Sequence, residues 1–292
     1  MRRHRGAADG PRHAGITTLV IPRVAALERL LAIIPTLEPP FILLEDAPRA
    51  PVRGSPWDAY LRLREVNPSP WMGFADCGDW LLVCGSPELL VKVAAAGDGR
   101  VVRTRPIAGT RKKTGVPTQD VRMRAELRLD EKERAEHLML VDLARNDTGR
   151  VAEFGSVVVA EREVVEEYSH VFHLVSEVRG RLRRQATAAD VLSSFFPGGT
   201  ISGCPKIRAM EIIRLLEPAA RGACTGALGW IGSEALQPNI VIRSAVVSTG
   251  QVVVRAGAGI VADSIPAREW RESLRKAEAI RLAFGLHDAG TS

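Results

Sequence analysis

LDEKERAEHLMLVDLARND, residues 129–147, has the pattern of a single amphipathic helix. Its apolar positions recur at helical spacing, at Leu138, Leu140, Val141 and Ala144. The same segment carries Glu133 and Glu136, which are three residues apart and therefore share one helix face. Such a charged pair is usually part of a solvated surface. It also suits Mg²⁺, which binds carboxylate oxygens, and this helix alone leaves both interpretations open.

A second segment, GAGIVADSIPAREWRESLRKAEAI (residues 257–280), predicts a glycine-rich turn followed by a helix. Glu269 and Glu272 repeat the three-residue spacing on that helix. Four carboxylates gathered at one buried place repel one another strongly unless a cation neutralises them. If the two helices converge, the sequence predicts a Mg²⁺ site formed by Glu133, Glu136, Glu269 and Glu272.

Length and composition are those of an ordinary folded protein. The chain has 292 residues, enough for one large domain or two smaller ones, with 46% hydrophobic and 25% charged residues. No apolar run approaches the roughly 18 residues that cross a membrane, and the N-terminus lacks an apolar signal segment. The four cysteines show neither zinc-binding nor redox spacing. We therefore expect a cytoplasmic protein without a membrane partner.

The positive net charge of +6 is concentrated at the N-terminus. The first 13 residues contain four arginines and one aspartate, and we expect residues 1–14 to form a disordered basic arm. The rest of the chain has only a modest excess of positive charge and no DNA- or RNA-binding motif. Nucleic acid is therefore not expected as a partner.

Strand-like and helix-like segments alternate along the rest of the chain. Residues 155–182 and 238–261 have the β-branched density of antiparallel strand pairs, the latter turning at residues 248–250. Residues 187–196 and 204–218 are predicted helices. This order predicts an α+β fold with large, mainly antiparallel sheets and flanking helices.

Six segments in this order resemble motifs of the chorismate-utilising enzymes. They are RPIAGTR (105–111), EKERAEHLMLVDLARND (131–147), SHVFHLVSEVRGRL (169–182), FPGGTISGCPKIRAMEII (196–213), NIVIRS (239–244) and AGAGIVADSIPAREWRES (256–273). The family includes anthranilate synthase component I, aminodeoxychorismate synthase component I, isochorismate synthase and salicylate synthase. The resemblance implies an anthranilate synthase component I-like fold, apparently shortened at its N-terminal side. Residues 15–50 would be a remnant of the N-terminal region, and residues 51–287 the chorismate-binding catalytic domain.

The resemblance also implies how the carboxylates act. Glu136 and Glu272 match direct Mg²⁺ ligands of the family, and Glu133 and Glu269 match their near or water-mediated partners. The ion would hold the ring carboxylate of the substrate.

The same resemblance implies a set of substrate-binding residues. Arg243 matches an arginine that grips a substrate carboxylate, a task suited to a planar guanidinium group. The GAG segment matches backbone N–H groups near the enolpyruvyl carboxylate, with a purely structural turn as the alternative. The substrate-binding residues implied in this way are Arg243, Thr225, Gly226, Gly257, Ala258 and Gly259.

Three residues match catalytic positions of the family. His173 matches a histidine proposed to move protons, and Thr110 a threonine near the reacting ring carbon. Lys276 matches a lysine near the substrate or metal. For Lys276 a solvated helix position, and for His173 a hydrogen-bonded core position, are the structural alternatives.

The motifs resemble the aminodeoxychorismate synthase component I branch most closely. That branch aminates chorismate to 4-amino-4-deoxychorismate, using ammonia from a glutamine amidotransferase (glutaminase) partner. Ala108 favours the anthranilate synthase branch instead, because many aminodeoxychorismate synthases have a nucleophilic lysine there and an alanine methyl cannot replace it. An inactive chorismate-binding remnant is the third alternative, because members of the family are usually longer.

Overall fold

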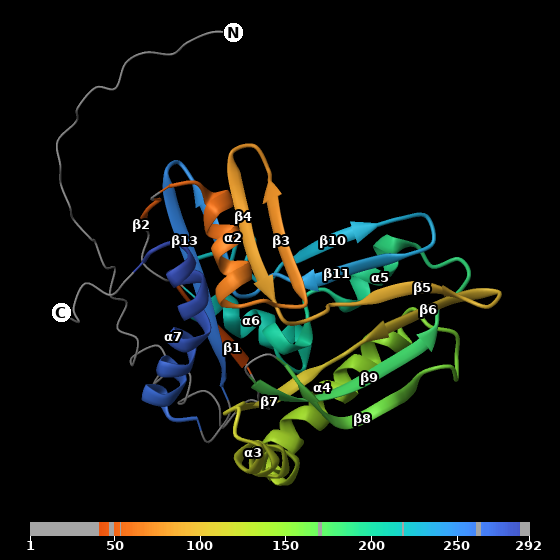
Figure 1. Ribbon diagram of the computed structural model, residues 1–292. Coiled ribbons are helices and arrows are strands. Elements are labelled where there is room, and N and C mark those ends of the chain that lie inside the picture. The colour runs from red at the N-terminus through yellow and green to blue at the C-terminus, as the bar shows by residue number, and fades with distance from the viewer. Residues whose placement is uncertain are drawn as a thin grey trace, which may run out of the picture.

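The computed structural model describes residues 41–46, 50–52, 54–168, 171–217, 219–260 and 264–286. The predicted basic arm, residues 1–14, and most of the predicted remnant, residues 15–50, lie outside these ranges. In the described part of the chain the expected α+β architecture is confirmed. Two antiparallel sheets carry helices on their faces (Figure 1).

Strands and helices alternate along the described part of the chain. The strands are β1 (Phe41–Asp46), β2 (Ala50–Pro51), β3 (Trp71–Asp76), β4 (Trp80–Ser86), β5 (Lys92–Ala96), β6 (Gly99–Thr104), β7 (Ile107–Lys112), β8 (Val158–Glu167), β9 (Val171–Arg181), β10 (Ala227–Ile231), β11 (Leu236–Ile240), β12 (Ser244–Ser248) and β13 (Gln251–Ile260). The helices are α2 (Pro56–Val66), α3 (Pro117–Leu129), α4 (Glu131–Gly149), α5 (Ala188–Phe195), the 3₁₀ helix η2 (Gly199–Ile201), α6 (Lys206–Leu216) and α7 (Pro266–Ala283). No helix within the described ranges is long and apolar enough to span a membrane.

The first sheet has six strands in the order β1-β13-β12-β4-β3, with β2 also paired to β13. The predicted hairpin turn is confirmed, since Ser248 pairs with Gln251 where β12 turns into β13. Helices α2 and α7 pack on this sheet and bury side chains such as Leu63, Val83 and Ile280. This core supports the β13 and α7 segments of the predicted site.

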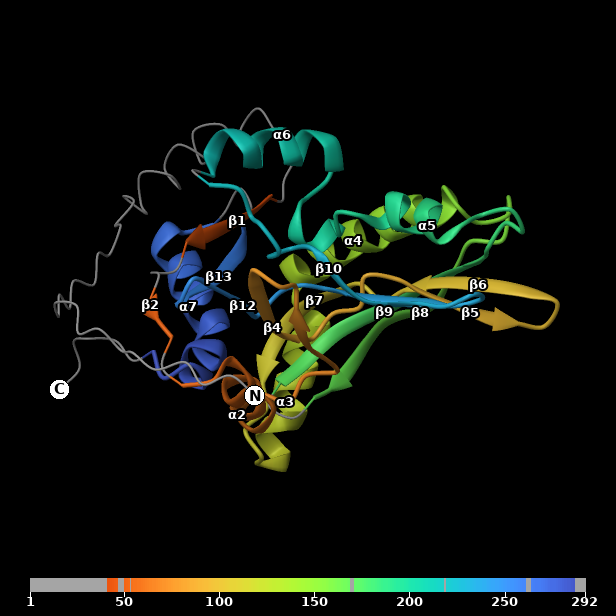
Figure 2. The same cartoon turned by 90° about the horizontal axis from the view of Figure 1, so that it is seen from above.

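The second sheet has seven strands in the order β10-β11-β5-β6-β9-β7, with β8 paired to β9. Helix α4 packs on β7 and β9, and Figure 2 shows α4 and α5 on the same side of the sheet. Buried residues Val102, Phe195 and Ile240 belong to the core cluster beneath them. The helix that carries Glu133 and Glu136 therefore packs on a sheet that a buried core supports.

Helix α4 begins later than predicted. Leu129 ends the preceding helix α3, and Asp130 is the N-cap of α4, with its side chain accepting a hydrogen bond from the Glu133 backbone N–H. An aspartate at this position satisfies an N–H group that has no partner within the helix. Leu138, expected on the apolar face, is 43% exposed. The prediction of one helix starting at Leu129 was wrong at this end.

The glycine-rich segment 257–259 is not a turn. It continues β13 as a regular strand, in which Gly257, Ala258 and Gly259 pair with Leu44, Leu43 and Ile42 of β1. The predicted turn was wrong because the partner strand is far away in the sequence and could not be identified from local residues.

The two sheets are joined by a short passage, residues 241–243, between β11 and β12. Arg243 lies at its end, and its carbonyl accepts a hydrogen bond from the Gly85 N–H of β4. The chain thus places a predicted substrate-binding arginine where it passes from one sheet to the other.

Candidate functional site

His173 lies on β9 between residues of two neighbouring strands. It pairs with Thr110 on β7 and with Glu166 on β8. Thr110 Oγ1 is 3.1 Å from His173 Nδ1, and the Gly109 carbonyl oxygen is 3.0 Å from the same nitrogen. The structure therefore brings the two predicted catalytic residues, His173 and Thr110, into direct contact.

The hydrogen bonds of His173 define which ring nitrogen can accept a proton. The Gly109 carbonyl oxygen can only accept a hydrogen bond, so Nδ1 carries the proton. Burial lowers the pKa of His173, with the nearby Arg243 cation acting in the same direction. The imidazole is therefore neutral at physiological pH, and its Nε2 is the basic nitrogen.

Glu133 is held over an irregular point in β7. A bulge in this strand contains Gly109 with φ +68°, and a Cβ there would lie 2.7 Å from Leu127 Cδ1 and 3.1 Å from Glu133 Oε2. Only glycine fits this conformation and this space without strain. Arg111 donates hydrogen bonds to Glu133 Oε1 at 3.2 Å and to Asp130 Oδ2 at 2.6 Å. The Glu133 carboxylate is thus already engaged by an arginine.

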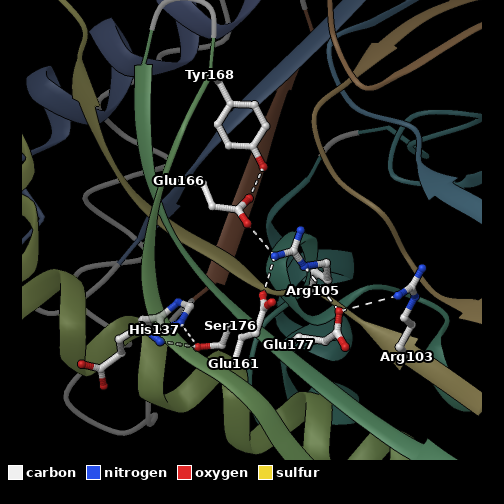
Figure 3. A network of polar contacts seen from close by, with 9 residues as sticks. Arg103, Arg105, His137, Glu161, Glu166, Tyr168, Ser176 and Glu177 are labelled. Carbon is white, nitrogen blue, oxygen red and sulfur yellow. Dashed lines mark hydrogen bonds and ion pairs between the residues drawn. The ribbon is translucent and has the colours of Figure 1, made fainter.

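Helix α4 is anchored to β9 by a buried polar contact next to Glu136. His137 is fully buried, and its Nε2 lies 2.6 Å from Ser176 Oγ (Figure 3). Burial lowers the pKa of His137 to about 4, so the ring is neutral. On the adjacent residue, Glu136 Oε1 lies 3.7 Å from the position that a Cβ on Gly259 would occupy. Glu136 therefore meets the GAG segment of β13.

Helix α7 carries the other pair of glutamates. Lys276 Nζ forms an ion pair with Glu272 Oε1 at 2.7 Å, and both side chains are about two-fifths exposed. The helix packs on β13, the strand that Glu136 also approaches at Gly259. Glu272 and Lys276, predicted as a metal ligand and a catalytic residue, are thus direct neighbours.

The four glutamates are only partly assembled as a metal site. Carboxylate oxygens are the donors that Mg²⁺ prefers, so their chemistry fits this ion. Within the described ranges, however, no three His, Cys, Asp or Glu side chains come together closely enough to hold a metal ion. Glu133 is paired with Arg111 and Glu272 with Lys276. The magnesium site therefore stays a prediction.

Glu88 is a site residue that the sequence did not reveal. It follows β4, is only 8% exposed, and accepts a hydrogen bond from Thr200 Oγ1 at 2.7 Å. Burial raises its pKa to about 7, although the Thr200 hydrogen bond and the Lys276 and Arg243 cations oppose this rise. A carboxyl group with this pKa can donate or accept a proton near neutral pH. The available signal was a lone carboxylate inside the apolar stretch LLVCGSPELLV.

Arg243 has a strained backbone and a partly buried cation. Its φ of 49° and that of Thr225, 63°, lie in the left-handed region that residues other than glycine rarely adopt. Burial lowers the pKa of Arg243, while the nearby Glu88 raises it. The Thr225 N–H donates to Val241 O at 2.7 Å, and the Val241 N–H donates to Gly226 O at 2.9 Å. Thr225 and Gly226 therefore support the backbone just before Arg243.

A small cavity of about 30 Å³ lies beside Glu88. Its walls are mainly apolar, including Leu140 and Leu143 of α4 and Phe195 of α5. Asp147, which forms an ion pair with Lys206 at 2.8 Å, also lines it. This lining separates the Glu88 carboxyl from bulk water and explains its raised pKa.

The chain is similar to known proteins in both sequence and structure. A family model described as "chorismate binding enzyme" matches residues 46–282. Aminodeoxychorismate synthase component 1 of Bacillus subtilis (strain 168) is 49% identical over 81% of this chain and 50% of its own length. Anthranilate synthase component 1 of Streptomyces coelicolor is 54% identical over 82% of this chain and 46% of its own length.

A solved structure is also similar. The crystal structure of anthranilate synthase component I from Streptococcus pneumoniae TIGR4 has a TM-score of 0.78 at 40% identity, and the match covers 88% of this chain and 57% of that one. The chain spans about half the length of the curated relatives it matches.

Proposed function

Because this chain belongs to the family of chorismate binding enzymes, we propose that it aminates chorismate with ammonia to give 4-amino-4-deoxychorismate. One observation carries the proposal: the Arg243 cation acts electrostatically on both Glu88 and His173, although the three residues come from separate segments. Lys276 of α7 also acts on Glu88. A cation, a carboxyl group with a pKa of about 7 and a neutral imidazole are together suited to binding and aminating a dicarboxylate.

The residues divide the work according to their chemistry. Arg243 binds one substrate carboxylate through its planar guanidinium group. Replacing the ring hydroxyl by ammonia releases water, and the leaving hydroxyl needs a proton. Protonated Glu88 donates that proton, and its pKa of about 7 keeps much of it protonated at neutral pH. His173 Nε2 accepts the proton that the incoming nitrogen loses, while Nδ1–H stays on the Gly109 carbonyl.

Magnesium is the cofactor that we propose. Glu136 and Glu272 would be direct ligands, with Glu133 and Glu269 near them, and bound Mg²⁺ would neutralise the ring carboxylate of the substrate. Glu272 would exchange its ion pair with Lys276 for the metal. Lys276 would then be available to interact with Glu88 or the substrate.

A glutamine amidotransferase subunit is the partner that we propose, because the proposed site accounts for amination but not for a source of ammonia. The designation "component 1" of the similar proteins supports this proposal. We also propose a cytoplasmic location, where the chain would meet such a biosynthetic partner.

Anthranilate formation is the second candidate, and one residue favours it. Ala108 is buried beside the β7 bulge, and its methyl group has no nucleophilic chemistry. Ammonia could then attack ring C2 directly, with loss of the same ring hydroxyl as water. Elimination of pyruvate would give anthranilate. The anthranilate synthases among the similar proteins also support this candidate.

Product analysis tests the proposal. Purified protein is incubated with chorismate, Mg²⁺ and ammonium at mildly alkaline pH, and the products are separated and identified by mass. Aminodeoxychorismate without pyruvate is the expected result. Anthranilate with pyruvate would transfer the protein to the second candidate. Unchanged chorismate, even with a glutaminase subunit present, would contradict amination and favour a chorismate-binding remnant.

Magnesium dependence is a separate prediction. We expect chelation by EDTA to abolish turnover and Mg²⁺ to restore it. In thermal or urea unfolding with chorismate present, Mg²⁺ at about 100 times its Kd should add about 2.7 kcal/mol to the free energy of unfolding. Glu272→Gln should remove this stabilisation, whereas Glu278→Gln, at an exposed position on the same helix, should retain it. Equal stabilisation of both variants would show that Glu272 does not hold the ion.

A further inference from the structure

Tyr168 lies beside the proposed proton acceptor. It follows the last residue of β8, and its ring meets the His173 imidazole edge to face, with centroids 5.2 Å apart and an angle of 70° between the planes. Its hydroxyl donates a hydrogen bond to Glu166 Oε2 at 2.9 Å. Glu166 is also the direct cross-strand neighbour of His173. Tyr168 and Glu166 therefore flank the imidazole on the side of β8.

Glu166 is itself fixed by a network of ion pairs. Arg105 Nη2 donates to Glu166 Oε1 at 2.6 Å and to Glu161 Oε2 at 2.8 Å. Glu177 Oε2 lies 3.8 Å from Arg105 Nε. Figure 3 shows the chain of contacts from Tyr168 through Glu166 to Arg105. The Tyr168 hydroxyl is thus bonded to a carboxylate that Arg105 also holds in place.

This arrangement restricts rotation of the His173 ring. Edge-to-face aromatic contacts depend on the angle between the rings, because the positive edge of one ring faces the negative face of the other. A rotated imidazole would lose both the Tyr168 contact and the hydrogen bond to the Gly109 carbonyl. Burial and the Glu166 carboxylate raise the pKa of Tyr168 to about 12, so the hydroxyl stays protonated and remains a donor.

We propose that Tyr168 is a positioning residue that acts through His173. Its ring contact and its hydroxyl tether to Glu166 hold the imidazole so that Nδ1–H points to the Gly109 carbonyl and Nε2 is kept as proton acceptor. The inference rests on the proposed function, because it assigns Tyr168 to the orientation of that acceptor. Tyr168 does not exchange a proton with the substrate.

A double-mutant cycle between Tyr168 and His173 tests this role. Tyr168→Phe keeps the ring and removes only the tether, and we expect it to lower kcat roughly tenfold while KM for chorismate stays within about twofold. In a His173→Gln background, Tyr168→Phe should cause no further loss. A tenfold loss in both backgrounds would mean that Tyr168 acts independently of His173, and would overturn the inference.

Tyr60 supplies the matched control. It is the other of the two tyrosines in the chain and packs against Trp57 and Phe74 in the α2 region. Tyr60→Phe should leave kcat unchanged, and thermal unfolding should show both single variants folded.

A measurement without turnover separates this inference from the proposed function. In ¹⁵N-histidine NMR spectra, the His173 signal, identified by its loss in His173→Gln, should show a protonated Nδ1 in slow exchange. Tyr168→Leu, which removes ring and tether together, should accelerate that exchange or shift the tautomer. An unchanged signal in folded Tyr168→Leu would overturn the positioning role, even if the wild-type protein does not aminate chorismate.

Discussion

Glu88→Gln is expected to lower kcat by about two to four orders of magnitude, the range associated with loss of a general acid. The amide keeps the size of the side chain and can still accept the Thr200 hydrogen bond, but it cannot supply a proton. Binding of chorismate should change little, because Arg243 is intact. Steady-state kinetics with product detection measures the effect.

Glu211→Gln is a suitable control for this substitution. Glu211 lies on α6, where its half-exposed side chain forms an ion pair with Arg208. The kcat of the Glu211→Gln enzyme should equal that of the wild type. A Glu88→Gln enzyme with more than about a tenth of wild-type kcat would assign the acid role to another group.

The same group predicts how stability depends on pH. The pKa of Glu88 is raised from 4.5 to about 7 in the folded protein, so the folded state binds its proton more tightly than the unfolded state does. The contribution of Glu88 to the free energy of unfolding is fully present below pH 4.5 and is lost as pH rises through 7. Between about pH 5 and about pH 8, the free energy of unfolding of the wild type should therefore fall by up to roughly 3 kcal/mol more than that of Glu88→Gln. Urea unfolding of both proteins at about pH 5 and about pH 8 measures this difference. An equal change in the free energy of unfolding of the two proteins would contradict the prediction.

Arg243→Lys is expected to weaken chorismate binding by about one to two orders of magnitude, although the charge is retained. A lysine ammonium cannot form the two parallel hydrogen bonds that a guanidinium makes to a carboxylate. Titration calorimetry with chorismate measures the dissociation constant directly. The structural consequence should be small, because the substituted lysine would keep a cation near Glu88.

Arg208→Lys, on the exposed side of α6, is the matched control and should bind as the wild type does. If Arg243→Lys binds chorismate with unchanged affinity, the arginine does not contact a substrate carboxylate. The left-handed backbone at residue 243 would then need a purely structural explanation.

Much of the fold could be predicted because local patterns and tertiary structure agree. The β8–β9 pair and helix α7 follow directly from β-branched density and helical spacing. Helix α3 was not predicted, since its sequence PTQDVRMRAELRL is mostly polar and buries little beyond Leu127. The strand at 257–259 depends on β1, whose position no local pattern could supply.

The site could be predicted in part, because some of its residues lie in recognisable sequence motifs. Motifs identified His173, Thr110 and Arg243. In the structure Thr110 contacts His173, and Arg243 lies close enough to influence the pKa of His173. Glu88 was missed because its raised pKa comes from burial by apolar neighbours that are distant in the sequence. The carboxylate cluster stays a prediction, since Glu133 and Glu272 are paired with cations in this structure.

The pairing of β1 with β13 and of β4 with β12 affects how the chain folds during synthesis. Strands β1 and β4 are synthesised well before their partners β13 and β12, and such distant pairings form slowly. Until β12 is made, β4 pairs only with β3, and the other edge of β4 is open to aggregation. Arg243 and the GAG segment, the proposed chorismate-binding residues, are synthesised after these strands, so chorismate could not stabilise intermediates that lack them. Chaperones that cover exposed strand edges should therefore raise the yield of active protein more than added substrate does.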